Sequence, residues 1–408
     1  MKIVKGWNKL WLFLMVLGPG IITSFADNDA GGITTYSIAG SHFGYKLLWV
    51  LLLVTVVLAL IQEMASRLGV VTGKGLADLI REEFGLRWTL FAMATLLIAN
   101  SATIISNFAG IAAGFELLGI FKYFSVPIMA LFIWILVVKG NYRQIERIFL
   151  LLCLLAFSYV ISGFLAKPDW GLALRSTFVP HFEFSAHYIF LLVAFIGTTI
   201  TPWMQFYLQA SVVDKGISIR QYKYERLEVV LGAFFTDFIS LFIVIACAAT
   251  LYKHGIRVET AKDAALALVP FAGQFTEYLF AVGLIGAAAL TSFIVPLSTS
   301  YAICEALGFE SGLDRKFREA PIFYGLYAIL IVIGACAILI PNISLVFIMY
   351  IAQFVQGLLL PVILVFMLLL VNNKRLMGTH VNSRVYNVIV WAMVLILITA
   401  SLTLVFLI

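Results

Sequence analysis

The chain has 408 residues, of which 62% are hydrophobic and only 12% are charged, and its mean hydropathy is +1.05. Soluble domains carry about 45–50% apolar and about 25% charged residues, so this composition excludes a soluble globular protein or a disordered chain. The formal net charge of +6 does not indicate nucleic-acid binding, because the basic residues lie in short gaps between recurring apolar runs. This pattern is typical of a polytopic helical protein in a lipid bilayer.

The apolar runs predict an all-α fold, since each span needs about 20 apolar residues. We predict eleven transmembrane helices, near residues 10–40, 45–68, 88–118, 121–138, 144–166, 187–213, 228–252, 274–307, 320–340, 342–371 and 384–408. The stretch 75–84, between the second and third spans, is too short and too polar to cross. We expect an interfacial helix there.

The distribution of Lys and Arg orients these spans. An odd number of spans places the termini on opposite sides. A cytoplasmic N-terminus puts the large majority of the 27 Lys and Arg residues on the cytoplasmic side. By the positive-inside rule we predict a multi-pass cell-membrane protein with a cytoplasmic N-terminus and an extracellular C-terminus.

Two of the expected spans carry helix-breaking motifs. The first span contains GPG at 18–20 and then DNDAGG at 27–32, and the sixth contains GTTITP at 197–202. Proline cannot donate to the helix hydrogen-bond ladder, and glycine lets the backbone leave helical geometry. We expect both helices to break near the bilayer midplane, where irregular backbone is tolerated only beside protein or a watery cavity.

The two breaks lie at corresponding places in the two halves of the chain. They predict a five-plus-five inverted repeat, with a first repeat at 1–166, a second at 167–371 and an extra span at 372–408. Paired interruptions of this kind indicate the substrate site of a transporter. Asp29 lies inside the first break, and a carboxylate at membrane depth is a functional hypothesis by default. The alternative is a pair of kinks without a ligand.

The stretch from Gly18 to Lys74 resembles the Nramp divalent-metal transporters. It opens GPGIITSFADNDAGGITTYSIAGSHFGYKLLWV and ends RLGVVTGK, and it keeps the family spacing without a gap from GPG through FGY. The resemblance extends along most of the chain, including Gln353 in the AQFVQGLLLP of the tenth span. It implies the fold of the amino-acid/sodium symporters and the transport of a divalent metal ion.

The departures from the family pattern bear on which metal is carried. The family's DPGN reads DAGG here, so Asp29 is retained and the asparagine ligand becomes Gly32. A carbonyl-donating alanine and a methionine thioether on the sixth span correspond to Thr198 and Thr201, and the histidines that usually follow are absent. An acidic pair expected on the third span aligns with an isoleucine and Asn107. This combination resembles the Nramp-related magnesium transporters.

The resemblance implies a metal site with oxygen ligands from Asp29, Thr198, Thr201 and Gln353, in which Gly32 leaves room for water. A thioether prefers softer metals, whereas Mg²⁺ prefers hard oxygen ligands and usually keeps several of its waters. We therefore predict partly hydrated Mg²⁺, and also Mn²⁺, as the transported substrate, with no resident cofactor. For isolated threonines, helix packing and interhelical hydrogen bonds are the alternative role.

Two further acidic residues have open roles. Asp27 lies two residues before Asp29 and either lines the cavity, with contact to the ion or its waters, or caps the half-helix. Asp237 is a lone acid in the seventh span, with apolar neighbours. Packing against a polar neighbour and support of the metal ligands are both compatible with that position.

The expected mechanism is alternating access without proton coupling. The five histidines belong to loops or span ends rather than to the midplane. Two charges crossing 100 mV, negative inside, gain about 4.6 kcal/mol, which supports on the order of a 10³-fold gradient. The alternatives are a proton-coupled Mn²⁺/Fe²⁺ transporter, with Asp29 or Asp237 as proton carrier, and a sodium-coupled organic-solute symporter. An enzyme is not expected, because a nucleophile–base pair and a metal-ligating His cluster are lacking, and no obligatory protein partner is evident.

Overall fold

The computed structural model describes residues 27–138, 154–312 and 317–407, and the regular elements in these ranges are helices. The longer ones are α3 (Ala30–Phe43), α4 (Leu48–Thr72), α5 (Leu76–Leu117), α6 (Lys122–Val138), α8 (Phe157–Leu165), α9 (Trp170–Phe178), α10 (Ala186–Thr199), α11 (Pro202–Asp214), α12 (Tyr222–Thr250), α15 (Thr276–Leu307), α16 (Pro321–Ile338), α17 (Leu345–Val371) and α19 (Arg384–Leu407). Shorter helical turns connect them: α13 (Ala261–Ala265), α14 (Val269–Ala272), α18 (Lys374–Met377) and 3-10 turns at Leu154–Ala156, Tyr252–His254, Leu266–Leu268 and Gly273–Phe275.

Eight helices of the described chain are long and apolar enough to cross a membrane: Leu48–Thr72, Leu76–Leu117, Ala186–Asp214, Tyr222–His254, Ala261–Leu307, Pro321–Ile338, Leu345–Val371 and Arg384–Leu404. The shorter apolar helices Lys122–Val138 and Leu154–Leu165 coincide with the predicted fourth and fifth spans. α3 is the described part of the first span, and the GPG motif at 18–20 lies outside the described residues. The predicted all-helical architecture is confirmed, with a described helix at each expected span.

The predicted break in the sixth span lies between α10 and α11. α10 ends at Thr199, and Ile200 leaves helical geometry with φ −122° and ψ 84°. Thr201 is extended, with φ −85° and ψ 141°, and α11 begins at Pro202. Proline suits the first position of a helix because its missing N–H would have no intrahelical acceptor there. The local sequence chemistry therefore fixes where this break falls.

The polar stretch after α4 forms its own short helix, as predicted, and is separated from the third span by a sharp kink. Gly85 has φ 76° and ψ 175° inside the continuous element α5. Glycine reaches positive φ without the Cβ penalty of other residues. The short helix buries Leu79 and Ile80, and its Glu83 pairs with Arg375 at 2.5 Å. An apolar face and an ion pair thus hold this helix against the rest of the molecule.

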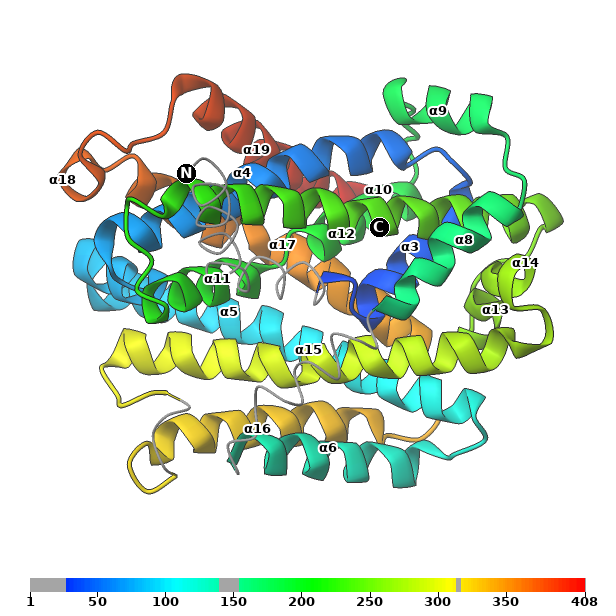
Figure 1. The fold of residues 1–408 in the computed structure, drawn as a ribbon, viewed down its shortest axis with the longest axis horizontal. Coiled ribbons are helices and arrows are strands. Elements are labelled where there is room, and N and C mark those ends of the chain that lie inside the picture. Colours follow the sequence, from blue (N-terminus) through cyan, green and yellow to red (C-terminus); the bar gives the residue numbers. More distant parts are fainter. Residues whose placement is uncertain (1–26, 139–153, 313–316, 408) are drawn as a thin grey trace, which may run out of the picture.

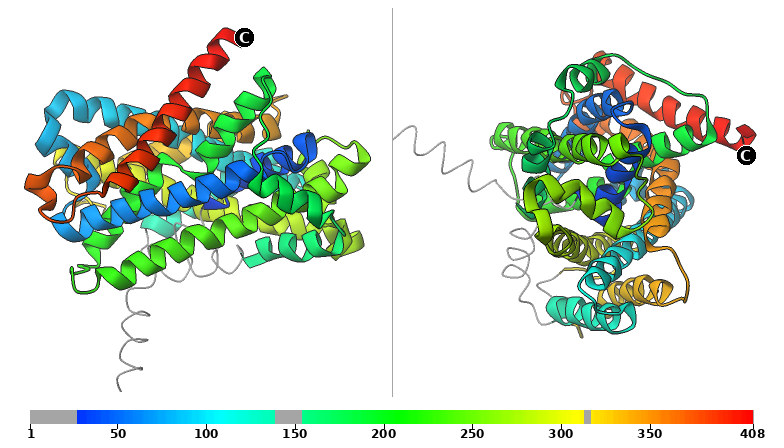
Figure 2. Two further views of the ribbon diagram at one scale, coloured as in Figure 1. Left: turned by 90° about the horizontal axis from the view of Figure 1, so that it is seen from above. Right: turned by 90° about the vertical axis from the view of Figure 1, so that its right-hand side faces the viewer.

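The broken sixth span is central and the last helix is peripheral. In Ala186–Asp214, 94% of the most apolar stretch is buried inside the protein. In Arg384–Leu404, only 28% of the corresponding stretch is buried. α5 and α15 run along each other, and α6 and α16 form an outer layer beside them (Figure 1). Figure 2 shows α19 leaving the body of the molecule towards the C-terminus. The elements that carry the predicted site therefore lie inside the bundle.

α10 and α17 approach closely at two glycines. A Cβ on Gly197 would overlap the backbone of Gln353 and Gly357, and a Cβ on Gly357 would overlap the backbone oxygen of Val193. Small residues permit such close contact between helices in membranes. This packing brings Gln353 of α17 beside the C-terminal end of α10.

Candidate cation-binding site at the helix breaks

The carboxylate of Asp29 is fixed at the start of α3. Its Oδ1 accepts a hydrogen bond from the Gly32 backbone N–H at 2.7 Å, and its Oδ2 accepts one from Asn107 Nδ2 at 2.8 Å. Only 5% of the residue is exposed. The N-terminus of a helix favours a negative charge, since its free N–H groups and dipole point towards it. The remaining carboxylate lone pairs are available to a cation.

Three oxygen atoms converge beside Gly32. A Cβ on this glycine would lie 3.0 Å from the Asp27 carbonyl oxygen, 3.3 Å from Thr198 Oγ1 and 3.5 Å from Asp29 Oδ1. The predicted ligands Asp29 and Thr198 therefore face the same small volume from α3 and α10. Any Cβ at position 32 would press against these oxygens, so glycine allows them to converge.

Several hydroxyls around the breaks are buried without a hydrogen-bond partner among the described residues. These are Thr198 Oγ1, Thr201 Oγ1 and Ser106 Oγ. Thr201 also makes no side-chain capping bond to α11. Buried hydroxyls normally have a partner. The lone pairs of these oxygens are therefore free for a ligand.

Gln353 contacts Gly31 from α17. Its Nε2 lies where a Cβ on Gly31 would stand, and its Oε1 accepts a hydrogen bond from Gln356 Nε2 at 2.7 Å. In this arrangement the amide nitrogen, rather than the oxygen, faces the start of α3. The helix packing thus brings Gln353 to Gly31 with its oxygen held by Gln356.

Asp27 reaches the volume beside Gly32 through its backbone. Its carboxylate is turned elsewhere, and Oδ2 accepts a hydrogen bond from Thr236 Oγ1 at 3.4 Å. Asn28 fixes the same segment, because its Nδ2 donates to Thr236 Oγ1 at 2.6 Å and its Oδ1 accepts from Ser240 Oγ at 2.9 Å. A polar cluster on α12 therefore holds the backbone that precedes α3.

Asp237 also lies on α12 and is 3% exposed. The Thr55 side chain of α4 lies within hydrogen-bonding range of its carboxylate. Thr236 and Ser240 are buried with it, so Asp237 is on the inward side of the helix, whereas the neighbouring Phe238 is exposed. It lies within electrostatic range of the carboxyl of Asp27. The structure gives Asp237 a place near the first break but no contact with Asp29.

Asn107 belongs to the site although it was not among the site residues predicted from the sequence. Its Nδ2 donates to Asp29, and its Oδ1 accepts from the Ala30 backbone N–H at 3.3 Å. An ionised acidic residue has no hydrogen to donate to Asp29. The sequence did carry a signal for this role, since Asn107 is an amide at a position where the family resemblance implies an acidic residue.

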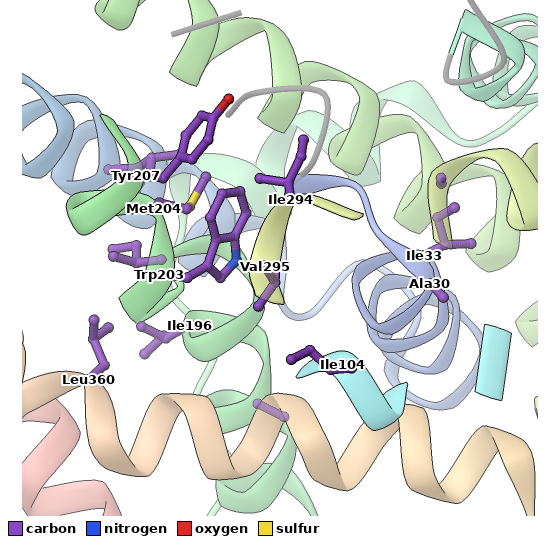
Figure 3. Close-up of a cluster of buried hydrophobic side chains, with 14 of the residues drawn as sticks. Ala30, Ile33, Ile104, Ile196, Trp203, Met204, Tyr207, Ile294, Val295 and Leu360 are labelled. Carbon is purple, nitrogen blue, oxygen red and sulfur yellow. The ribbon is translucent and has the colours of Figure 1, made fainter. Parts of the chain in front are cut away.

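The candidate ligand atoms beside Gly32 are oxygens, with one carboxylate among them. The described residues contain no group of three or more His, Cys, Asp or Glu able to hold a metal ion. The proposed ligands are themselves buried, since Asp29 is 5% and Thr198 is 1% exposed. Figure 3 shows Trp203 of α11 directed towards Val295 of α15. The site is therefore shielded from water in this conformation.

Comparison with known sequences gives a family match over almost the whole chain. The family described as Natural resistance-associated macrophage protein-like (Nramp) matches residues 20–407. A divalent metal cation transporter MntH of Bacillus subtilis (strain 168) is 26% identical over 416 residues, covering 98% of this chain and 93% of the relative. One of the same name from Deinococcus radiodurans is 28% identical over 406 residues, covering 95% and 88%.

Comparison with solved structures supports the same fold. The Eremococcus coleocola manganese transporter has a TM-score of 0.79 at 21% identity, covering 96% of this chain and 86% of that chain. A nucleobase-cation-symport-1 family transporter has a TM-score of 0.59 at 14% identity, covering 96% and 91%. The predicted symporter-type fold with its inverted repeat is therefore confirmed. On the extent of the family match, the chain belongs to the Nramp family.

Proposed function

We propose that this protein imports divalent metal ions, with partly hydrated Mg²⁺ as its main substrate and Mn²⁺ as a second one. Membership of the Nramp family and the names of the relatives, which are divalent metal cation transporters, support metal transport. One observation carries the choice of metal: three oxygens, from Asp27, Asp29 and Thr198, surround the volume beside Gly32. The proposal thus assigns the chain to the magnesium-transporting branch of the family.

The chemistry of Mg²⁺ suits this volume. Mg²⁺ binds oxygen at about 2.0–2.1 Å, loses water reluctantly and is held by one or two carboxylates while several waters remain. We propose that the absence of a side chain at position 32 gives room for such waters when the ion is bound, and that the Asp29 carboxylate supplies the charge. Thr201 contributes an oxygen where a thioether would favour softer metals. Mn²⁺ also accepts oxygen ligands and is expected to compete.

Gln353 joins this site by a coordinated rotation of two amides. If Gln353 and Gln356 both turn their amides over, the hydrogen bond between them is retained with the donor and acceptor exchanged. The Gln353 oxygen then faces Gly31 and the start of α3. We therefore propose that ion binding selects this second arrangement of the Gln353–Gln356 pair.

Transport requires the site to open on each side in turn, because its ligands are buried. Asp29 is 5% exposed, Thr198 1% and Gln353 0%. We propose alternating access, driven by the membrane voltage, in a cell-membrane protein with a cytoplasmic N-terminus and an extracellular C-terminus. No protein partner is needed for this mechanism.

The test is metal influx into proteoliposomes that contain the purified protein. Wild-type protein is expected to take up Mg²⁺ and Mn²⁺ more readily than Ca²⁺, whose larger coordination shell fits the volume less well. Asp29→Ala and the isosteric Asp29→Asn are expected to abolish uptake while elution and thermal unfolding stay close to wild type. Glu259→Gln removes an exposed carboxylate and is the matched control. Wild-type flux in a well-folded Asp29→Asn protein would contradict the site assignment.

A second function, proton-coupled Mn²⁺ transport, has one specific observation in its favour. The Asp237 carboxylate is buried, with 3% of the residue exposed, and lies within electrostatic range of a second carboxyl, that of Asp27. A carboxylate in that state can be protonated at little cost and so could carry a proton. The measurement that separates the two mechanisms is the proton flux that accompanies metal uptake.

A further inference from the structure

Two histidines meet at the ends of α3 and α10 that lie away from the helix breaks. His42 is the penultimate residue of α3, and His187 is in the first turn of α10. His42 Nδ1 and His187 Nε2 are 3.2 Å apart. The ring centroids are 5.4 Å apart, so the two nitrogens lie between the rings and face each other. This pair is remote from the cation site, since α3 rises about 20 Å between Asp29 and His42.

The spacing of the two nitrogens matches a pair of ligands on one metal ion. Zinc binds imidazole nitrogen at about 2.0–2.1 Å, so two ligands at a tetrahedral angle stand about 3.3 Å apart. A modest rotation of both rings would turn their lone pairs towards a common ion. One of the two histidines now donates its N–H to the other. On metal binding this histidine changes tautomer, so that the hydrogen moves to its other ring nitrogen and both rings stay neutral.

The surroundings permit this rotation and leave the site open to solvent. The Val258 backbone lies within hydrogen-bonding range of the His42 ring, so this ring needs to turn only a little while His187 turns more. His187 is exposed and stacks on Phe43 with ring centroids 5.3 Å apart. Arg257 lies within electrostatic range of both histidines, and Glu183, which pairs with Lys46 at 3.3 Å, lies within range of His187. The exposed side of His187 is therefore the side from which an ion and its waters would reach the pair.

We propose that His42 and His187 form a second metal site, which takes a borderline transition-metal ion such as Zn²⁺, Cu²⁺ or Ni²⁺ rather than the transported Mg²⁺. Imidazole suits these metals, whereas Mg²⁺ prefers oxygen. The bound ion bridges α3 to α10, the two half-helices whose opposite ends carry Asp29 and Thr198. The Tyr36–Thr199 hydrogen bond, at 2.8 Å, already links the middle of α3 to the last residue of α10.

The test uses Cu²⁺, which binds nitrogen sites most tightly and reports its ligands by electron paramagnetic resonance. Purified full-length protein in detergent is titrated with Cu²⁺ in excess Mg²⁺. The expected spectrum contains one tightly bound ion per chain with hyperfine structure from two imidazole nitrogens. His42→Gln and His187→Gln are each expected to lower the Cu²⁺ affinity by at least about tenfold and to remove the two-nitrogen signature.

Two controls make the result specific. His254→Gln alters another histidine, whose Nδ1 lies against the Thr250 backbone oxygen, and should leave the spectrum unchanged. Asp29→Ala should also leave it unchanged, because the transport site lies elsewhere. A two-nitrogen spectrum that survives in both folded His42→Gln and His187→Gln proteins would overturn the proposal. So would the complete displacement of Cu²⁺ by Mg²⁺.

Discussion

At the scale of single residues, the proposed cation site depends on how the Asp29 carboxylate is held and on the absence of a side chain at Gly32. Asp29 receives hydrogen bonds from the Gly32 backbone and from the Asn107 amide. Residues that orient a ligand commonly change metal affinity when they are replaced. Asn107 therefore has a testable role even though its own atoms are engaged with Asp29 and Ala30.

Replacement of Asn107 by alanine should raise the Mg²⁺ concentration for half-maximal uptake by about 10- to 100-fold, because Asp29 loses its orienting donor. The maximal rate should fall less, since the carboxylate remains. Asn100→Ala is the matched control: Asn100 is a fully buried asparagine on the same helix, but it donates to Thr299. Equal shifts in the two variants would show that general loss of packing, rather than the contact with Asp29, is responsible.

The double variant Gly32→Asn with Thr201→Met should move selectivity from Mg²⁺ towards Mn²⁺ or Cd²⁺. It adds a thioether, and its new side chain at position 32 fills the volume between the Asp27, Asp29 and Thr198 oxygens. Isothermal titration with each metal measures the ratio of affinities. Thr201→Ser keeps the hydroxyl and should keep the wild-type preference. An unchanged ratio in the double variant means that these positions do not set selectivity.

At the scale of helices, the parts of the fold that follow from local chemistry could be predicted from the sequence. Gly197 and Pro202 placed the break between α10 and α11 correctly. The Asn107–Asp29 contact could not be predicted, because it joins two helices and depends on how α5 packs against α3. The amide orientation of Gln353 likewise depends on Gln356 and on the crossing of α10 and α17. Pairings of this kind are set by three-dimensional packing rather than by any local pattern.

Because α10 and α17 cross closely at Gly197, even an added methyl group there should lower the stability of the fold. Gly197→Ala should destabilise the fold by about 1–3 kcal/mol, because the new Cβ overlaps the α17 backbone and the two helices must separate. Gly325→Ala in α16 is the control, since a Cβ there meets nothing within 4 Å. That variant should be neutral or slightly stabilising, because alanine is the better helix former. Thermal unfolding in detergent compares the two, and equal midpoints would contradict the packing argument.

At the scale of the whole molecule, the arrangement supports an ion path through a central, broken pair of helices. Ala186–Asp214 is the most buried of the candidate spans, and Arg384–Leu404 is the least. This agrees with a last helix outside the repeated core. The exact repeat limits, 1–166 and 167–371, stay predictions, as does the orientation of the termini.

The central claim is that a divalent ion crosses through the Asp29 site under the membrane voltage, without an accompanying proton. The most direct test clamps proteoliposomes with potassium and valinomycin and records Mg²⁺ influx together with internal pH. Influx should follow the imposed negative voltage, with two charges gaining about 4.6 kcal/mol across 100 mV. Internal pH should stay constant, and a pH gradient alone should drive little uptake. Metal-dependent internal acidification that disappears in Asp237→Asn, with the metal still bound, would contradict the account and make Asp237 the proton carrier.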